Sequence, residues 1–257
     1  MIGCIVIACL AISVAGVFFA TSRTQTSPTS TLAPTRTPIP TATLKLIPPT
    51  VTSIPTLTMT VTAAALSVGE ILLEDDFDTN SVWDTGTDAD SSVEYLGDAL
   101  NFQIFTSNYF VWSTPNDEDY EDIHMEVTVI NYGTDGNTAF GFMCNQQSDA
   151  NSFHYFAITP LGQYAIARSE TGQTDLFLTN SDDWEYSDLI PQNAASYRIG
   201  ADCGIDGTLT LYVDGQVIDS AVDLSYTSGG VGLFAWSAVN PVKTDISFDD
   251  FLITDLP

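Results

Sequence analysis

The stretch DEDYEDIHMEV, residues 117–127, gathers six carboxylates and one of the two histidines of the chain into eleven residues. Paired carboxyl groups hydrolyse glycosidic bonds, and a histidine beside a carboxylate transfers protons. The residues in this stretch that such chemistry would use are Asp122, His124 and Glu126. They are therefore the first candidates for a catalytic centre.

The spacing of these residues argues against a glycosidase. Apolar residues alternate from Ile123 to Val129, which predicts a strand with one core face, and Asp122, His124 and Glu126 lie on the other face. Asp122 and Glu126 would then stand about 13 Å apart. Retaining glycosidases need about 5–5.5 Å and inverting ones about 6.5–9.5 Å. An acidic strand is expected, and His124 forms either a proton-transferring couple with a neighbouring carboxylate or an ordinary surface contact.

Aromatic side chains offer a different chemistry, because sugars bind to aromatic faces flanked by polar groups. In NYFVWSTP, Phe110 and Trp112 share one face of an expected strand and Tyr109 shares the other with Val111. One of these two sets is expected to be exposed and to bind a ligand. Arg168, one of three basic residues after position 69, either holds a ligand or pairs internally with a carboxylate.

The elements that would position these residues are short strands. Alternating runs of seven to nine residues recur between clusters of Gly, Asn, Asp and Ser, and no helical period is sustained. This pattern predicts one all-β domain, a sandwich of two antiparallel sheets, over residues 70–257. The runs that carry the prediction are 99–105, 123–130, 138–144, 153–159, 163–169, 197–203, 209–215, 230–236 and 245–253.

The first 69 residues have a different composition. Residues 2–20 are uncharged and apolar enough for a hydrophobic helix, so residues 1–20 are expected to be a transmembrane anchor, with a lipoprotein modified at Cys9 or a cleaved signal peptide as alternatives. Residues 21–69 are rich in Thr, Ser and Pro, which predicts a disordered, extended stalk. Membrane contact is expected through the N-terminal segment alone, with the domain displayed at the cell surface.

Charge excludes one class of partner. The chain has 33 Asp and Glu against 6 Lys and Arg, and every acidic residue lies at or after Glu70. Such a domain repels the phosphate backbone, so no nucleic acid is expected as a partner.

Four blocks of the domain resemble the concanavalin A-like lectin and glucanase superfamily, in particular its laminin-G-like and 3-keto-disaccharide-hydrolase-like jelly rolls on bacterial surfaces. The blocks are LLEDDFDTNSVW (72–83), GFMCNQQSDANSFHYFAITPLGQYAIAR (141–168), YRIGADCGIDGTLTLYVDGQVI (197–218) and GGVGLFAWSAVNPVKTDISFDDFLI (229–253). The resemblance implies a jelly-roll sandwich. Residues 121–126 depart from the Glu-x-Asp-x-x-Glu motif of the laminarinase-type hydrolases, so no catalytic role is carried over.

The resemblance also implies two structural features. Cys144 and Cys203 lie in blocks where this group often carries a cysteine pair, and an external location favours a disulfide between them. Several such jelly rolls bind a structural Ca²⁺ where the first and last strands meet, and the acidic groups there make Asp76 and Asp249 the candidate ligands, with a plain acidic surface as the alternative.

Together these features predict an anchored, non-catalytic, lectin-like module at the cell surface that binds a glycan or a protein partner. Two alternatives remain open: a structural or adhesion domain without a small ligand, and a glycan-directed hydrolase with a non-standard carboxylate and histidine centre.

Overall fold

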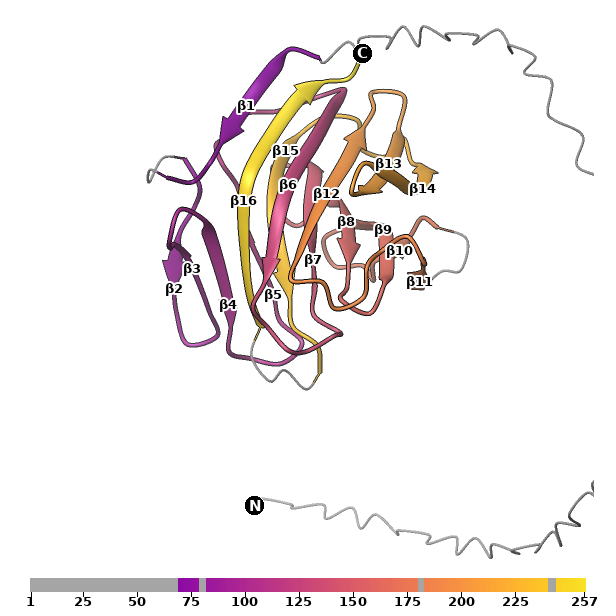
Figure 1. Cartoon of the computed structure of the whole chain (residues 1–257). Helices are drawn as coiled ribbons and strands as arrows, with labels where there is room; N and C mark the ends of the chain where they lie inside the picture. Colours follow the sequence, from indigo (N-terminus) through magenta and orange to yellow (C-terminus); the bar gives the residue numbers. More distant parts are fainter. Residues whose placement is uncertain (1–68, 79–81, 180–182, 240–243) are drawn as a thin grey trace, which may run out of the picture. The chain divides into compact units, whose positions relative to one another are not determined.

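The computed structural model describes residues 69–78, 82–179, 183–239 and 244–257. The expected N-terminal helix and nearly the whole of the expected stalk lie outside these residues. In the described part of the chain, no helix has the length and hydropathy that a membrane crossing needs. The described residues form two antiparallel sheets, as the alternating runs predict (Figure 1).

The larger sheet has nine strands and contains the acidic strand β6. Its order is β14 (Gln216–Val222), β13 (Thr208–Val213), β12 (Ser196–Cys203), β6 (Ile123–Asn131), β16 (Thr244–Asp255), β4 (Leu100–Ile104), β3 (Ser91–Tyr95) and β2 (Gly86–Thr87), and β1 (Ile71–Asp75) pairs with β16.

The smaller sheet has seven strands and carries the aromatic segment β5. Its order is β10 (Leu176–Phe177), β9 (Gln163–Ser169), β8 (Phe153–Ile158), β7 (Ala139–Gln146), β15 (Gly230–Trp236) and β5 (Phe110–Ser113), and β11 (Glu185–Tyr186) pairs with β9.

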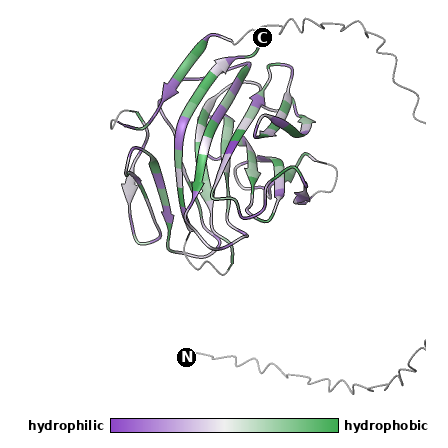
Figure 2. Ribbon diagram, in the orientation of Figure 1, coloured by the Kyte–Doolittle hydropathy of each residue, from purple (hydrophilic) through white to green (hydrophobic). Residues whose placement is uncertain are grey.

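The main core lies between the two sheets. On β6, Ile123, Met125, Val127 and Val129 are at most 1% exposed and point inward, as the alternation predicts. The same alternation is visible as bands of hydropathy along several strands (Figure 2). Burial of these side chains, and of the aromatic side chains in the same core, is the main force that holds the sheets together.

Strand β16 keeps its core face by means of a bulge. The buried apolar residues of this strand are Ile246, Phe248, Phe251 and Ile253. They are two, three and two positions apart. The register with β6 shifts between Asp249 and Leu252, where Asp250 has a φ of 50°. The extra residue turns Phe251 back into the core, where its ring lies 4.9 Å from that of Trp83. A plain two-residue alternation would have pointed Phe251 to solvent.

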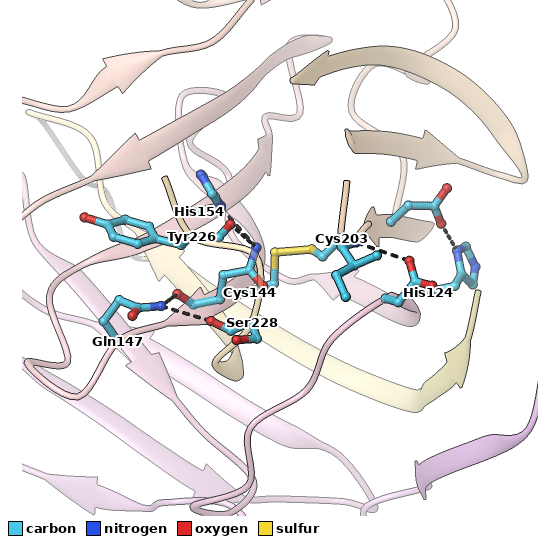
Figure 3. Close-up of a disulfide and its surroundings, with 11 residues drawn as sticks. His124, Cys144, Gln147, His154, Cys203, Tyr226 and Ser228 are labelled. Atoms are coloured by element: carbon cyan, nitrogen blue, oxygen red, sulfur yellow. Dashed lines mark hydrogen bonds and ion pairs between the residues drawn. A yellow bond between two sulfur atoms is a disulfide. The ribbon is translucent and has the colours of Figure 1, made fainter. Parts of the chain in front are cut away.

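A disulfide joins the two sheets. Cys144 of β7 and Cys203 of β12 are bonded, with an S–S length of 2.05 Å and a Cα–Cα distance of 6.7 Å (Figure 3). Both cysteines are at most 1% exposed. The structure therefore contains the expected pair, and it ties β7 of one sheet to the end of β12 in the other.

Candidate functional site

The outer face of the seven-stranded sheet has a hollow with an aromatic lining, which we call the central hollow. Its volume is about 480 Å³, within the size range of small-molecule sites. Small residues such as Ala139 and Ala157 leave the space open. The residues that line it are Phe110, Trp112, Ala139, Asn151, Phe153, Tyr155, Ala157, Ser169, Asp175, Phe177, Trp184, Phe234 and Trp236.

Strand alternation places these aromatic residues. On β8, Phe153, Tyr155 and Ala157 belong to an apolar cluster on the outer face, whereas Phe156 and Ile158 belong to the core between the sheets. Phe234 joins the outer cluster from β15. Each strand thus sends one set of side chains to the core and the other to the hollow.

The rings of the hollow form a stacked platform. The ring of Phe110 lies 4.8 Å from that of Phe234 at 26°, and 6.0 Å from that of Phe153 at 17°. Trp112 lies beside Phe110 at 5.8 Å and is 37% exposed. Phe153 and Phe234 are 5% and 1% exposed, so these rings form the floor of the hollow, and the more exposed Trp112 offers an aromatic surface that suits the apolar C–H face of a sugar ring.

Polar groups stand beside the platform. The Tyr155 hydroxyl donates a hydrogen bond of 3.1 Å to Asp175 Oδ2. Burial of the phenol and the negative charge of Asp175 raise the pKa of Tyr155, so the hydroxyl keeps its proton and remains a donor. Asn151 and Ser169 add further polar atoms to the lining. The hollow therefore combines apolar faces with groups that can bind hydroxyls.

The expected ligand residues divide between the two faces of β5. Phe110 and Trp112 both line the central hollow. Tyr109 packs against the core between the sheets and borders a neighbouring hollow. Phe153, Phe177 and Phe234 also line the hollow and were not predicted from the sequence. The alternation of Phe153, Tyr155 and Ala157 along one strand face is the signal that could have revealed the first of these.

Arg168 lies away from the central hollow. It shares the inner side of β9 with Tyr164 and Ile166, and its Nη1 lies 2.6 Å from Asp223 Oδ2. The same Nη1 donates to the Ser225 hydroxyl, and Glu170 lies 3.8 Å from Nη2. The structure thus places Arg168 in an internal ion pair, one of the two roles that the sequence left open.

His154 lies next to the disulfide and is completely buried (Figure 3). The Asn145 side-chain amide donates to the Tyr226 carbonyl and to His154 Nδ1, which places the imidazole proton on Nε2. Nε2 has no hydrogen-bond partner and lies 3.6 Å from Asp223 Oδ2. Burial lowers the pKa of His154 and outweighs the opposing charge of Asp223, so the ring is neutral at pH 7.

His124 and Glu126 lie on the outer face of the other sheet, away from the central hollow. His124 Nδ1 is 2.6 Å from Asp202 Oδ1, and Nε2 is 3.4 Å from Glu126 Oε1. Burial lowers the pKa of His124, but the hydrogen bonds and charges of Asp202 and Glu126 outweigh it and raise this pKa above its usual value. Both ring nitrogens are therefore engaged by carboxylates.

The network continues on both sides of this histidine. Tyr212 donates to Asp202 Oδ2 at 2.6 Å, and Arg198 Nη2 lies 2.9 Å from Glu126 Oε2. Asp202, Tyr212 and Arg198 come from β12 and β13, so the sequence around 117–127 could not reveal them. This row of side chains links neighbouring strands, and Arg198 also lines a hollow of about 360 Å³ that carries Glu74, Asp75, Asp76 and Asp250.

Asp122 does not join His124. Its Oδ1 accepts a hydrogen bond from the Ile205 amide, and its backbone has a φ of 55°. The side chain thus holds the turn between β12 and β13. Of the three catalytic candidates, the structure brings together His124 and Glu126 but not Asp122.

The two acidic chain ends of the domain come together because β1 pairs with β16. Asp76 Oδ1 accepts from the Asp78 amide, and Asp249 Oδ1 accepts from the Asp250 amide. Burial raises the pKa of Asp249, and the nearby charges of Asp250 and Asp76 act in the same direction. Within the described ranges, no group of three acidic, histidine or cysteine side chains is arranged to hold a metal ion. The calcium site stays a prediction.

No family model and no curated protein matches this sequence. Solved structures do match. The carbohydrate-binding module CBM66 from Bacillus subtilis is 15% identical, with a TM-score of 0.52, and covers 68% of this chain and 96% of its own. A Bacillus subtilis protein with a galectin-like fold is 11% identical, with a TM-score of 0.54 and coverages of 73% and 97%.

A third similar structure is the Bacteroides ovatus mixed-linkage glucan GH16 protein in complex with the product G4G4G3G. It is 13% identical, with a TM-score of 0.50, and covers 71% of this chain and all of its own. At such identities the likeness concerns the fold. The two antiparallel sheets and these neighbours together show that the described domain has the concanavalin A-like jelly-roll fold.

Proposed function

We propose that this protein is a cell-surface carbohydrate-binding module without catalytic activity, and that its ligand lies in the central hollow. The observation that carries the proposal is the stacked platform of Phe110, Phe153 and Phe234, flanked by the partly exposed Trp112. The hollow thus has a nearly buried aromatic floor at Phe153 and Phe234 and an exposed aromatic side chain at Trp112, a combination on which the apolar face of a sugar can pack.

The composition of the hollow favours binding over hydrolysis. Among the described residues that line it, Asp175 is the single carboxylate. Hydrolysis by the usual routes takes two carboxyl groups, about 5–9.5 Å apart. The other candidate pair, His124 and Glu126, lies on the opposite sheet and is bound by Asp202 and Arg198. This arrangement supports a ligand that is held and released unchanged.

Two similar structures support a glycan as the ligand. One is described as a carbohydrate-binding module, and the other is a complex with the product G4G4G3G. The expected anchor and stalk would hold the domain outside the cell, and the disulfide suits an oxidising compartment. A glycan of the cell's surroundings is therefore the proposed partner.

A binding screen tests this function. We would apply the full chain, kept in a mild detergent, to arrayed polysaccharides that include mixed-linkage β-glucan, galactomannan, levan and polygalacturonate. The expected result is saturable binding to at least one of them and its loss in Trp112→Ala. A lack of binding across the array would contradict the proposal and favour the structural or adhesion role, whereas equal binding by Trp112→Ala would contradict the placement of the ligand in the central hollow.

The same screen in EDTA tests the calcium prediction. Loss of binding in EDTA and its return with added Ca²⁺ would support a metal at Asp76 and Asp249. Unchanged binding would keep the carbohydrate-binding function and remove the metal from it.

A further inference from the structure

Two further hollows border the central hollow on different sides. One, which we call the Asn137 hollow, measures about 360 Å³ and shares Trp184 and Trp236 with the central hollow. The other, the Thr87 hollow, measures about 410 Å³ and shares Phe110 and Trp112 with it. The aromatic platform is therefore the middle of a longer run of hollows, and a chain lying on it meets more surface in two directions.

The charges along this run have one sign. Asp175 lines the central hollow, Asp135 the Asn137 hollow, and Asp84 and Asp88 the Thr87 hollow. Among the described residues, no Lys, Arg or His lines any of the three. Arg168 is bound to Asp223 on the inner side of its sheet. The described lining of the run thus offers no cation to balance an acidic ligand.

Several of these carboxylates are fixed by hydrogen bonds of their own loops. Asp135 Oδ1 accepts from the Asn137 amide at 2.9 Å. Asp88 Oδ1 accepts from the amides of Ser91 and Asp90, and these bonds lower the pKa of Asp88. The carboxylates of Asp135 and Asp88 are therefore held in place at the rims of the hollows.

We propose that the run of hollows binds an internal segment of an uncharged polysaccharide and discriminates against glycans that carry carboxylate or sulfate groups. This inference rests on the proposed carbohydrate-binding function. Each acidic group on a ligand would come within the Debye length of fixed carboxylates, about 8 Å at physiological salt, with no compensating cation among the described lining residues. Neutral hydroxyls instead donate to these carboxylates and accept from the side-chain amides of Asn151 or Asn137.

The charge selectivity is tested on polysaccharides that differ in charge alone. The full chain is titrated with mixed-linkage β-glucan and with galactomannan, and then with each polymer after partial oxidation of C6 to the uronate. The expected result is at least tenfold weaker binding of the oxidised polymer at 0.15 M salt, with part of the loss recovered at 1 M salt. Equal or tighter binding of the oxidised polymer would overturn the inference and leave the carbohydrate-binding function intact. Binding of neither form would count against both.

Two charge variants distinguish repulsion by the carboxylates of the hollow from repulsion by the net charge of the whole domain. Asp175→Asn removes a carboxylate from the central hollow, and Asp206→Asn removes one from the exposed turn between β12 and β13 of the other sheet. We expect the ratio of the two dissociation constants, oxidised over neutral, to fall at least threefold in Asp175→Asn and to stay unchanged in Asp206→Asn. An equal fall in both variants would show that the net charge of the domain, and not the hollow, sets the selectivity.

Chain length tests the internal mode of binding. We would measure competition by glucose and by mixed-linkage β-glucan oligosaccharides of two to eight units against the bound polymer. Affinity is expected to rise at least tenfold between two and six units, because a longer chain reaches the Asn137 and Thr87 hollows. A monosaccharide that competes as well as a hexasaccharide would overturn the internal mode and indicate a site for chain ends.

Discussion

The ring of Phe110 on β5 stacks on the ring of Phe153 on β8, although β15 and β7 lie between these two strands. Three strand spacings separate the backbones by about 14 Å. The rings come within 6.0 Å of each other beside Phe234, whose partner in the register on β7 is Gly141. Since Gly141 has no side chain, the aromatic residues of three strands can join into one surface.

Removal of Trp112 should weaken ligand binding by more than it lowers the stability of the fold. Trp112 is 37% exposed, so Trp112→Ala removes a ligand contact together with the buried part of the indole, and the thermal melt measures the cost of that second loss. We expect roughly tenfold weaker polysaccharide binding, which corresponds to about 1.4 kcal/mol. Tyr132→Ala is the matched control, because Tyr132 is 63% exposed and does not line the central hollow. Isothermal titration and a thermal melt of each variant give the two readouts, and equal losses in both variants would contradict the prediction.

Loss of the disulfide should destabilise the domain without changing the site. The Cys144–Cys203 bond closes a loop with a sequence separation of 59. Such a loop lowers the entropy of the unfolded chain by an amount worth about 4 kcal/mol. The double variant Cys144→Ala/Cys203→Ala should have a free energy of unfolding that is lower by that amount, and it should therefore unfold at a lower urea concentration. Reductant should then shift the wild type toward the variant and leave the variant unchanged, whereas a shift in the variant would point to another reducible group.

Much of the fold could be predicted because its long strands are regular. The nine alternating runs correspond to β4, β6, β7, β8, β9, β12, β13, β15 and β16. Strands with polar or mixed sequences, such as β3 and β14, were not predicted, since their side chains follow no clear alternation. The bulge at Asp249 and Asp250 also needed the structure, because an inserted residue is visible only against a partner strand.

The candidate site was predictable to a smaller extent. The alternation in NYFVWSTP separated Phe110 and Trp112 from Tyr109, but it could not show which set faces the core. That choice depends on the neighbours Phe153 and Phe234, which come from other strands. Contacts between strands distant in the sequence likewise decide the partners of His124, so Asp202 was missed.

The two histidines should titrate on opposite sides of the ordinary value. The chain has two His residues, so two imidazole signals are expected in a proton–nitrogen spectrum. Burial lowers the pKa of His154, whereas Asp202 and Glu126 overcome burial and raise the pKa of His124. One signal should therefore titrate above about 6.5 and the other below it. His124→Gln and His154→Gln assign the signals, and two superimposable titration curves would contradict the structure.

The raised pKa of His124 makes part of the stability pH-dependent. A base whose pKa is higher in the folded state contributes stability that is fully present below its unfolded pKa, about 6.5, and is lost as the pH rises through the folded value. Glu126 has the opposite dependence, because Arg198 and His124 overcome its burial and lower its pKa, so its contribution is lost in acid. The network should therefore be most stabilising between about pH 4.5 and 6.5.

Urea denaturation of the wild type and His124→Gln isolates this effect. His154, which is buried neutral, destabilises the fold as the pH falls below about 6.5, but it does so equally in both proteins and cancels in the difference. We expect His124→Gln to be less stable than the wild type by roughly 1 kcal/mol at pH 6, since the imidazole lies between two carboxylates. The difference should shrink at pH 9, where the wild-type imidazole is neutral. A difference that is constant from pH 6 to 9 would show that His124 acts through packing against Tyr212 and not through its charge.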